Sequence, residues 1–277
     1  MKDRLEKSLT QRFGERLEVA EPAGGSETLE RIVSRGSCRA FRQEPVSSAM
    51  LHTLLACALS APSKSDLQQA DILHVADHSK RSVIQGLIPG MPWIADAPVF
   101  LVFLANNRRQ RQLAGWRAKP WPNDHLDPFF NATVDAAIAL GFFVVSAEAV
   151  GLGCCPISVI RNHSAVVSDL LELPDHVIPV AGLALGWPQF PTPRITPRLS
   201  LRTTLHTDRF DDEDVEAEIL AYDERRRAIM PYREQRRVDV FGEDPEYGWS
   251  EEKARHYAEP ERADFGAFVK RKGFRLE

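Results

Sequence analysis

The sequence contains few cysteines, and none of them is arranged to bind a metal or to form a disulfide framework. Four cysteines occur in 277 residues, no two of them with C-x-x-C spacing, and no cluster of histidine and cysteine is present. Zinc sites and disulfide-stabilised secreted folds need such patterns, so both classes are excluded. Cys154 and Cys155 are adjacent. A vicinal disulfide is one alternative there, but two buried thiols are expected, because a reduced cysteine packs as a small apolar side chain.

Long apolar stretches are also lacking. The most apolar run, Ala136 to Ala147, has about twelve residues between Asp135 and Glu148, fewer than a membrane-spanning helix needs. The N-terminal segment from Met1 to Ala20 is charged and lacks the apolar core of a signal peptide. A soluble, cytoplasmic protein with no membrane partner is therefore expected.

Positive charge is not in excess. The chain has 35 Lys and Arg against 39 Asp and Glu, a formal net charge of -4. A nucleic-acid-binding domain carries a basic excess, so no nucleic-acid partner is expected. Hydrophobic residues make up 43% of the chain, which is enough for an ordinary buried core.

Several common catalytic motifs are missing. The sequence has no G-x-S-x-G, no G-x-x-x-x-G-K-[ST] and no H-E-x-x-H. Gly151 and Gly153 resemble part of a dinucleotide-binding fingerprint, but they follow a predicted helix instead of a strand, and the third glycine is absent. The sequence therefore contains no recognisable motif for a nucleophile or for a metal site.

Apolar periodicity and capping residues predict both helices and strands. Helices are expected from Ser26 to the turn at Arg35, from Ser47 or Ser48 to Pro62, from Asp77 to about Leu87, from Asn131 to Val150, from Ala165 to Leu173 after a Ser164 cap, from Asp211 to Arg227 and from Ser250 to Lys272. Strands are expected at Ile72–Ala76, Val99–Leu104 and Val177–Gly186. Residues 1–25 are expected to form a leader, and residues 105–130 a surface excursion.

One short stretch is suited to hold a phosphate. Arg35-Gly36-Ser37-Cys38-Arg39-Ala40-Phe41 places two guanidiniums and a hydroxyl in one turn. Arginine offers a planar fork of donors that matches phosphate oxygens, and glycine lets the backbone approach a ligand. The alternative is an exposed basic loop with surface ion pairs.

Three further stretches follow it in order. They are Pro62-Ser63-Lys64-Ser65-x-x-Gln68, then Cys155-Pro156-Ile157-Ser158, then Gly186-Trp187-Pro188 followed by Pro197-Arg198-Leu199. Each is weak alone, but the ordered set resembles the FMN-dependent nitroreductase family, and in particular its oxygen-insensitive NADPH nitroreductase and flavin reductase branch. The resemblance runs from about residue 27 to the C-terminus.

The resemblance implies an α+β fold with a mixed sheet flanked by helices. It also implies a homodimer in which a C-terminal arm, about residues 211–277, wraps the partner subunit and two FMN molecules lie at the interface. In that reading residues 26–277 form one FMN-binding domain after the leader.

The resemblance also implies the cofactor-binding residues. The FMN phosphate is assigned to Arg35, Ser37, Arg39 and Arg198, and the ribityl chain and ring edge to Ser63, Ser65 and Gln68. The flavin N5 and O4 are assigned to the backbone N–H groups of Ile157, Ser158 and Val159. Gly36, Pro62 and Pro156, which lie beside these residues, are also counted as cofactor-binding. The family branch often has a lysine two residues before the late arginine. This chain has Thr196 there, so either Arg194 compensates or phosphate affinity is lower.

The implied activity is ping-pong transfer of two electrons from NADPH or NADH, through flavin N5, to a nitroaromatic, quinone or free flavin, with no catalytic residue from the protein. The arginines near the C-terminal end of the chain (225–227, 233, 236 and 237) either select the NADPH 2′-phosphate or form a solvated, salt-bridged face with the interleaved acidic residues. Two other functions stay open: a relative performing reductive dehalogenation or dehydrogenation, and a flavin-binding sensor without turnover.

Overall fold

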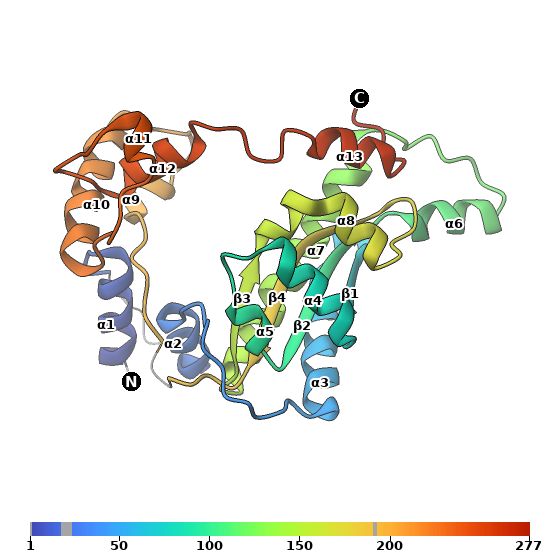
Figure 1. Cartoon of the computed structure of the whole chain (residues 1–277), viewed down its shortest axis with the longest axis horizontal. Helices are drawn as coiled ribbons and strands as arrows, with labels where there is room; N and C mark the ends of the chain where they lie inside the picture. The colour runs from blue at the N-terminus through green and yellow to red at the C-terminus, as the bar shows by residue number, and fades with distance from the viewer. Residues whose placement is uncertain (1, 18–23, 191–192) are drawn as a thin grey trace. The chain divides into compact units, whose positions relative to one another are not determined.

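The computed structural model describes residues 2–17, 24–190 and 193–277, and the chain forms two compact units (Figure 1). The sheet unit contains residues 37–192 and 262–277, and the helical unit contains residues 1–36 and 193–261. Residues 18–23, where the predicted leader ends, lie outside the described residues. The predicted boundary between a leader and one domain at residue 26 stays a prediction.

The sheet unit is built on four strands in the order β1-β2-β4-β3. Their bounds are β1 (Ala70–His74), β2 (Val99–Asn106), β3 (Gly153–Ile157) and β4 (Val177–Gly186). The α+β class is confirmed. Every strand pair in the described part of the chain is antiparallel, so the mixed sheet that the resemblance implied is not what these strands form.

Strand β3 was not predicted. The expected strands did not include it, but Gly153–Ile157 pairs with β4 at one edge of the sheet. Glycine and proline both disfavour strands, and Pro156 is tolerated because an edge strand leaves backbone positions without a ladder partner. Strand β1 also begins two residues earlier than expected.

The central strand β2 is buried on both faces, as its continuous apolar run predicted. Phe100, Val102 and Leu104 enter one core cluster, and Val99, Leu101 and Phe103 enter another. This alternation follows from the two-residue period of a strand. Helices therefore cover both sides of the sheet.

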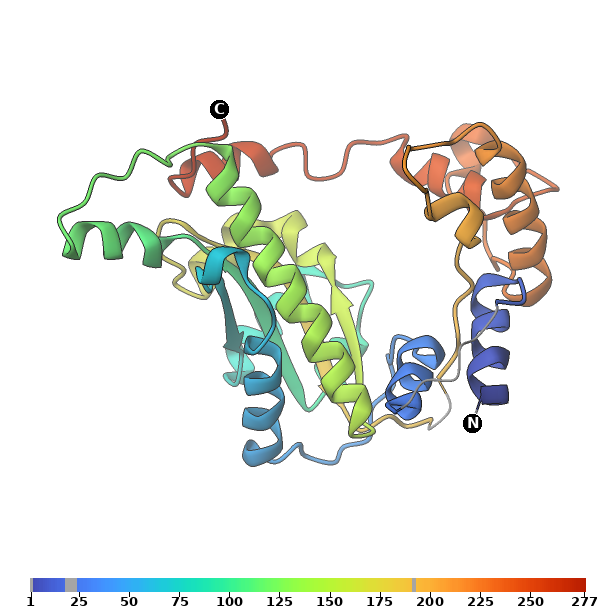
Figure 2. The same cartoon turned by 180° about the vertical axis from the view of Figure 1, so that it is seen from behind.

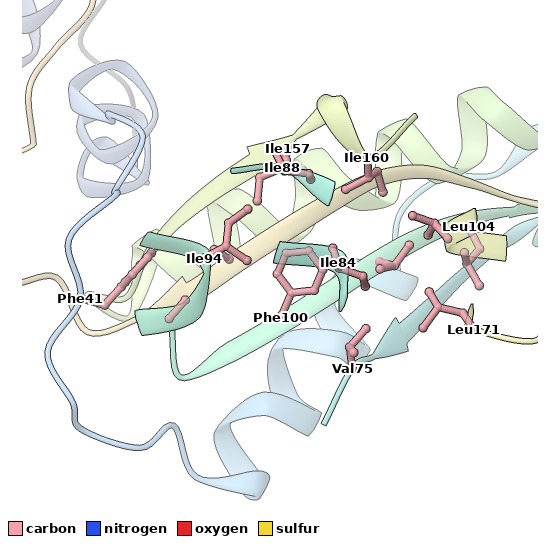
Figure 3. Close-up of a cluster of buried hydrophobic side chains, with 14 of the residues drawn as sticks. Phe41, Val75, Ile84, Ile88, Ile94, Phe100, Leu104, Ile157, Ile160 and Leu171 are labelled. Atoms are coloured by element: carbon pink, nitrogen blue, oxygen red, sulfur yellow. The ribbon is translucent and has the colours of Figure 1, made fainter. Parts of the chain in front are cut away.

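On one face lie α4 (His78–Leu87), α5 (Trp93–Asp96), η2 (Ser158–His163) and α8 (Ser164–Leu170). Figure 3 shows the cluster that they close, in which Ile84, Ile94 and Ile160 meet Phe100. Asp77 caps α4 as predicted, since its carboxylate accepts the Ser79 and Lys80 amides.

On the other face lie α3 (Ser48–Leu59) and α7 (Leu126–Ala149), with α7 crossing the sheet (Figure 2). Ser47 caps α3 as one of the two predicted alternatives. Helix α7 begins five residues before the predicted start, and by length and composition alone it could cross a membrane. Core helices pass the same test, and Ala139, Phe143 and Ala147 pack α7 on the sheet.

The chain returns to the sheet unit at its C-terminal end. Helix α13 (Phe265–Arg271) buries Phe268 and Val269, together with Phe274 just after it, against Ile178 and the first half of α7. The Lys272 carbonyl accepts the His176 amide at 2.7 Å. The single helix predicted from Ser250 to Lys272 is therefore two helices, one in each unit.

The helical unit contains α1 (Lys2–Phe13), α2 (Ser26–Ser34), α9 (Leu201–Thr204), α10 (Val215–Ile229), α11 (Val238–Phe241) and α12 (Trp249–Tyr257). Asp223 of α10 accepts the Ser250 amide at 3.0 Å and so satisfies the start of α12, while Tyr222 packs edge-on against Trp249. Gly25, and not Ser26, is the capping residue of α2, and it has a positive φ of 75°.

Two of the remaining expectations differ in detail. Residues 105–130 were expected to be an irregular excursion, but they contain α6 (Arg108–Trp116). Ser164 is the first residue of α8 and makes no capping bond to it. Cys154 and Cys155 are both buried, as expected.

Candidate functional site

The predicted cofactor-binding residues fall in both units. Arg35, Gly36 and Arg198 belong to the helical unit. The others belong to the sheet unit: Ser37, Arg39, Pro62, Ser63, Ser65, Gln68, Pro156, Ile157, Ser158 and Val159.

In the helical unit Arg35 and Arg198, 163 positions apart in the sequence, line the same cavity of about 690 Å³. Three further cations line it, Arg12, Arg226 and Lys253, and its described lining contains no aspartate or glutamate. Aromatic walls are provided by Phe13, Tyr222, Tyr232 and Trp249. A lining that is rich in cations and lies beside aromatic side chains suits an aromatic ligand that carries an anion.

The turn that carries Arg198 is held on three sides. The Arg198 amide donates to the Arg12 carbonyl at 2.6 Å, and the Tyr222 hydroxyl donates to the Pro197 carbonyl at 3.0 Å. The Arg225 guanidinium donates to the Arg198 carbonyl at 2.6 Å. With its backbone fixed in this way, the exposed Arg198 side chain extends from a rigid base.

Gly36 is required by its surroundings. A Cβ atom at this position would lie 2.5 Å from the Arg194 carbonyl oxygen, much closer than real Cβ contacts come. The backbone of residue 194 thus lies against the Arg35-Gly36 turn, while the Arg194 side chain is exposed. Whether Arg194 compensates for Thr196 stays a prediction.

In the sheet unit, the segment from Ser37 to Phe41 is anchored at Cys38 and at Phe41. The Cys38 amide donates to the Cys154 carbonyl at 3.0 Å, and buried Phe41 forms a β-bridge with Pro188. Ser37 and Arg39, on either side of Cys38, are exposed, so both side chains are accessible to a ligand. Burial raises the pKa of the Cys38 thiol, which disfavours a reactive thiolate there.

The predicted ribityl loop lines a second cavity, of about 480 Å³. Three non-glycine residues of this loop have left-handed backbone angles: Ser65 (φ 50°), Asp66 (φ 57°) and Gln68 (φ 51°). Such angles cost about 1–2 kcal/mol per residue, so surrounding bonds must hold the loop. Clustered backbone strain is characteristic of ligand-binding loops.

Asp135 of α7 provides two of those bonds. Its side chain is 2% exposed, and its two carboxylate oxygens accept the Lys64 amide at 3.0 Å and the Gln69 amide at 3.1 Å. Arg109 and Gln110 of α6 donate to the Gln68 and Leu67 carbonyls from the other side.

Sequence reasoning missed these bracing residues. Asp135 carried a signal, because it is an acid directly beside the apolar run of its helix, where a buried carboxylate needs hydrogen-bond donors. Arg109 and Gln110 lie in the segment expected to be a variable excursion, and Arg12 lies in the segment expected to be a leader.

The predicted stretch from Pro156 to Val159 lies partly in the core and partly on the surface. The Ile157 side chain is 1% exposed and belongs to the hydrophobic core, whereas Pro156 and Ser158 are exposed and Val159 is half-buried. The accessible positions of this stretch are therefore Pro156 and Ser158, and Val159 in part. Whether these amides face a cofactor stays a prediction.

Three of the six arginines near the C-terminal end of the chain are paired with acidic residues. Arg236 pairs with Glu252 at 2.9 Å and Arg227 with Glu246 at 3.7 Å, while Arg237 pairs with Glu259. These pairs favour the salt-bridged alternative over a dedicated 2′-phosphate site. The described residues hold no group of three or more histidines, cysteines and acids able to bind a metal ion.

Comparison with known proteins places these features in a family. The sequence model of the nitroreductase family matches residues 32–187, and that of the nitroreductase family C-terminal domain matches residues 196–277. The FMN reductase [NAD(P)H] of Bacillus subtilis is 31% identical over 91% of this chain and 99% of its own length. The oxygen-insensitive NADPH nitroreductase of Salmonella typhimurium is 34% identical over 72% of this chain and 81% of its own.

Solved structures agree. The NfrA2 structure from B. megaterium superimposes with a TM-score of 0.81 at 30% identity, covering 91% of this chain and 99% of the other. Two sequence models together span most of the chain, and a relative of 31% identity aligns over 91% of it. The chain belongs to the nitroreductase family.

Proposed function

We propose that the protein is an NAD(P)H-dependent FMN oxidoreductase that reduces small electron-poor acceptors such as nitroaromatics, quinones or free flavins. The names of its relatives support the reaction class. The observation that carries the proposal is the convergence of Arg35 and Arg198 on one cavity with a cationic lining.

The residues present fit the phosphate of FMN. A phosphate dianion needs opposite charge and directed donors, and the cavity supplies five cations with no acid among its described lining residues. Each charge-assisted hydrogen bond of this kind contributes about 1.5–3 kcal/mol. Arg35 and Arg198 would bind the phosphate, and we assign Ser37 and Arg39 to the same group because they follow Arg35 within four residues.

The remaining contacts are assigned to the sheet unit. Ser63, Ser65 and Gln68, on the strained loop held by Asp135, would bind the ribityl chain and the ring edge, with Pro62 at the start of the loop. The backbone from Pro156 to Val159 would face the reactive edge of the ring. A pre-formed loop suits this role, because it orients the ligand without an ordering cost at binding.

FMN, when bound, supplies the hydride-accepting and hydride-donating chemistry, and the protein supplies position and electrostatics. A single ring face would receive the nicotinamide and then the acceptor, so the two substrates bind in turn and the kinetics are ping-pong. No protein nucleophile is needed, in keeping with the raised pKa of the Cys38 thiol.

The assembly proposed is a cytoplasmic homodimer in which residues 211–261 of the C-terminal arm lie on the partner subunit, while α13 packs on the sheet unit of its own chain. Helix α7 supports it, because the helix buries one side on the sheet and exposes Leu126, Phe130 and Phe142 elsewhere. Exposed apolar side chains of this size on one helix are typical of a surface that another subunit covers.

The experiment is a titration of the purified, flavin-stripped protein with FMN, followed by NADPH oxidation with and without a nitroaromatic. We expect a yellow protein whose NADPH oxidation is stimulated by the acceptor. Arg198→Ala should weaken FMN binding about tenfold or more, since one charge-assisted bond is lost. Arg202→Ala, an exposed arginine of the same unit outside the cavity lining, should not.

Each contrary outcome has a distinct meaning. A protein that binds FMN but shows no stimulated oxidation would be a flavin-binding sensor. A protein that takes up no FMN would refute the cofactor assignment and the activity together.

A further inference from the structure

The N-terminal helix α1 is not accounted for by family membership. The two family models match residues 32–187 and 196–277, so Lys2–Phe13 lies outside both. The helix nevertheless contributes Arg12 and Phe13 to the lining of the basic cavity. Its last turn therefore meets the residues proposed to bind phosphate.

Arg12 is the point of contact. The side chain is 7% exposed, and its guanidinium donates to three backbone carbonyls: Val33 at 2.6 Å, Arg35 at 2.5 Å and Thr196 at 3.4 Å. Its own carbonyl accepts the Arg198 amide at 2.6 Å. One residue thus bonds to the backbone of both arginine-bearing turns.

A second contact from the same segment reinforces the arrangement. The Glu15 carboxylate accepts the Leu201 amide at 2.8 Å, beyond the Arg198 turn. Arg12 in the last turn of α1 and Glu15 just after the helix thus bond to the chain on both sides of Arg198, at Thr196 and Leu201. Fixed turns matter, because a guanidinium binds a phosphate strongly only when its planar fork is held in the required orientation.

We propose that Arg12 is a positioning residue for the phosphate site: by bonding to both turns it holds Arg35 and Arg198 in one orientation, so that affinity for a phosphorylated flavin depends on a helix outside the matched family regions. This inference rests on the proposed function. Arg12 acts on the backbone of its neighbours, and its role is to orient the two arginines that touch the ligand.

The role predicts an effect specific to the phosphate. FMN and riboflavin have the same ring and ribityl chain, and only FMN carries the phosphate. Arg12→Ala should therefore weaken FMN binding about ten- to a hundredfold, the effect of losing one well-oriented charge-assisted bond, and leave riboflavin binding unchanged. A general loosening of the fold would weaken both ligands alike.

Arg12→Lys separates orientation from charge. Lysine keeps the positive charge and most of the stem, but a single ammonium group cannot reach three carbonyls in the fork geometry. We expect this variant to bind FMN as weakly as the alanine variant. If Arg12→Ala does not fold, the ratio of the affinities for FMN and riboflavin is measured on Arg12→Lys instead. Arg4→Ala is the matched control, an exposed arginine on the same helix that pairs with Glu30 at 3.6 Å.

The test is titration of the full-length, flavin-stripped protein with FMN and with riboflavin, for wild type, the two Arg12 variants, Arg4→Ala and Arg198→Ala. A collapse of the FMN preference in both Arg12 variants and in Arg198→Ala, but not in Arg4→Ala, supports the inference. If Arg12→Lys binds FMN with full affinity, the positive charge at position 12 is sufficient, and the proposed orienting role of Arg12 is refuted. Loss of preference in Arg198→Ala alone would refute the inference and leave the proposed function standing, whereas a wild-type protein without FMN preference would refute both.

Discussion

The buried carboxylate of Asp135 offers the sharpest test of how the sheet unit shapes its candidate binding loop. Asp135→Asn changes one oxygen of the side chain into an NH₂ group. Since both carboxylate oxygens accept backbone amides, from Lys64 and Gln69, the amide side chain can satisfy only one of them. The other backbone N–H then faces the side-chain NH₂ group, which is itself a donor and cannot accept its hydrogen bond.

The magnitude follows from the surroundings. Gln69 is fully buried, and a buried donor without an acceptor costs about 1–3 kcal/mol. The bond that remains also loses its charge assistance, so the total loss is about 2–4 kcal/mol. The loop contains three residues with left-handed angles, which together store about 3–6 kcal/mol, so it should relax locally once its support weakens.

Amide hydrogen exchange measures this directly. A local loss of 2–4 kcal/mol corresponds to exchange about 30- to 1,000-fold faster at Lys64 and Gln69. Asp127→Asn makes the same change on an exposed residue in the first turn of α7 and should cost about 0.3–1 kcal/mol without affecting the loop. Wild-type exchange at both amides in Asp135→Asn would show that the carboxylate does not hold the loop.

Two further predictions concern the other parts of the structure. Gly36→Ala should lower FMN affinity about tenfold or more in a flavin titration, because the new methyl group would overlap the Arg194 carbonyl, whereas Gly86→Ala, with open space around it on α4, should leave affinity unchanged and cost no stability. For His176, burial and the nearby Arg111 guanidinium lower the pKa below its ordinary value of 6.5. Between that value and the lowered one the unfolded chain binds more protons, so stability rises with pH there, and urea unfolding of His176→Gln should show a flatter dependence; an unchanged slope would exclude this residue as the source.

The parts of the fold that the sequence predicted are those with a strong local signal. The apolar runs of β2 and β4 and the caps Ser47 and Asp77 specify their elements without help from distant residues. Strand β3 has no such signal, because Gly153 and Pro156 oppose strand formation and only pairing with β4 stabilises it. The helix expected after Ser250 was placed as one element because nothing local shows that the chain leaves one unit for the other between α12 and α13.

The residues of the candidate site likewise fall into those that the sequence predicted and those that it did not. Arg35 could be identified because two arginines, a serine and a glycine share one short turn, and Arg198 because the ordered set of stretches resembles a known family. The structure places both arginines on one cavity. Asp135 and Arg12 could not be identified, since each acts by bonding to backbone far away in the sequence, and backbone carbonyls and amides carry no residue identity. Supporting residues of this kind are visible only in three dimensions.

The late return of the chain to the sheet unit has a consequence for how the protein is made. Phe268, Val269 and Phe274 fill a core between α7 and β4, yet residues 193–261 are synthesised before them. At translation rates of about 5–20 residues per second, the sheet unit waits several seconds on the ribosome with part of its core open to water. Nascent chains stalled before residue 265 should therefore recruit chaperones, and release of the final helix should end that dependence.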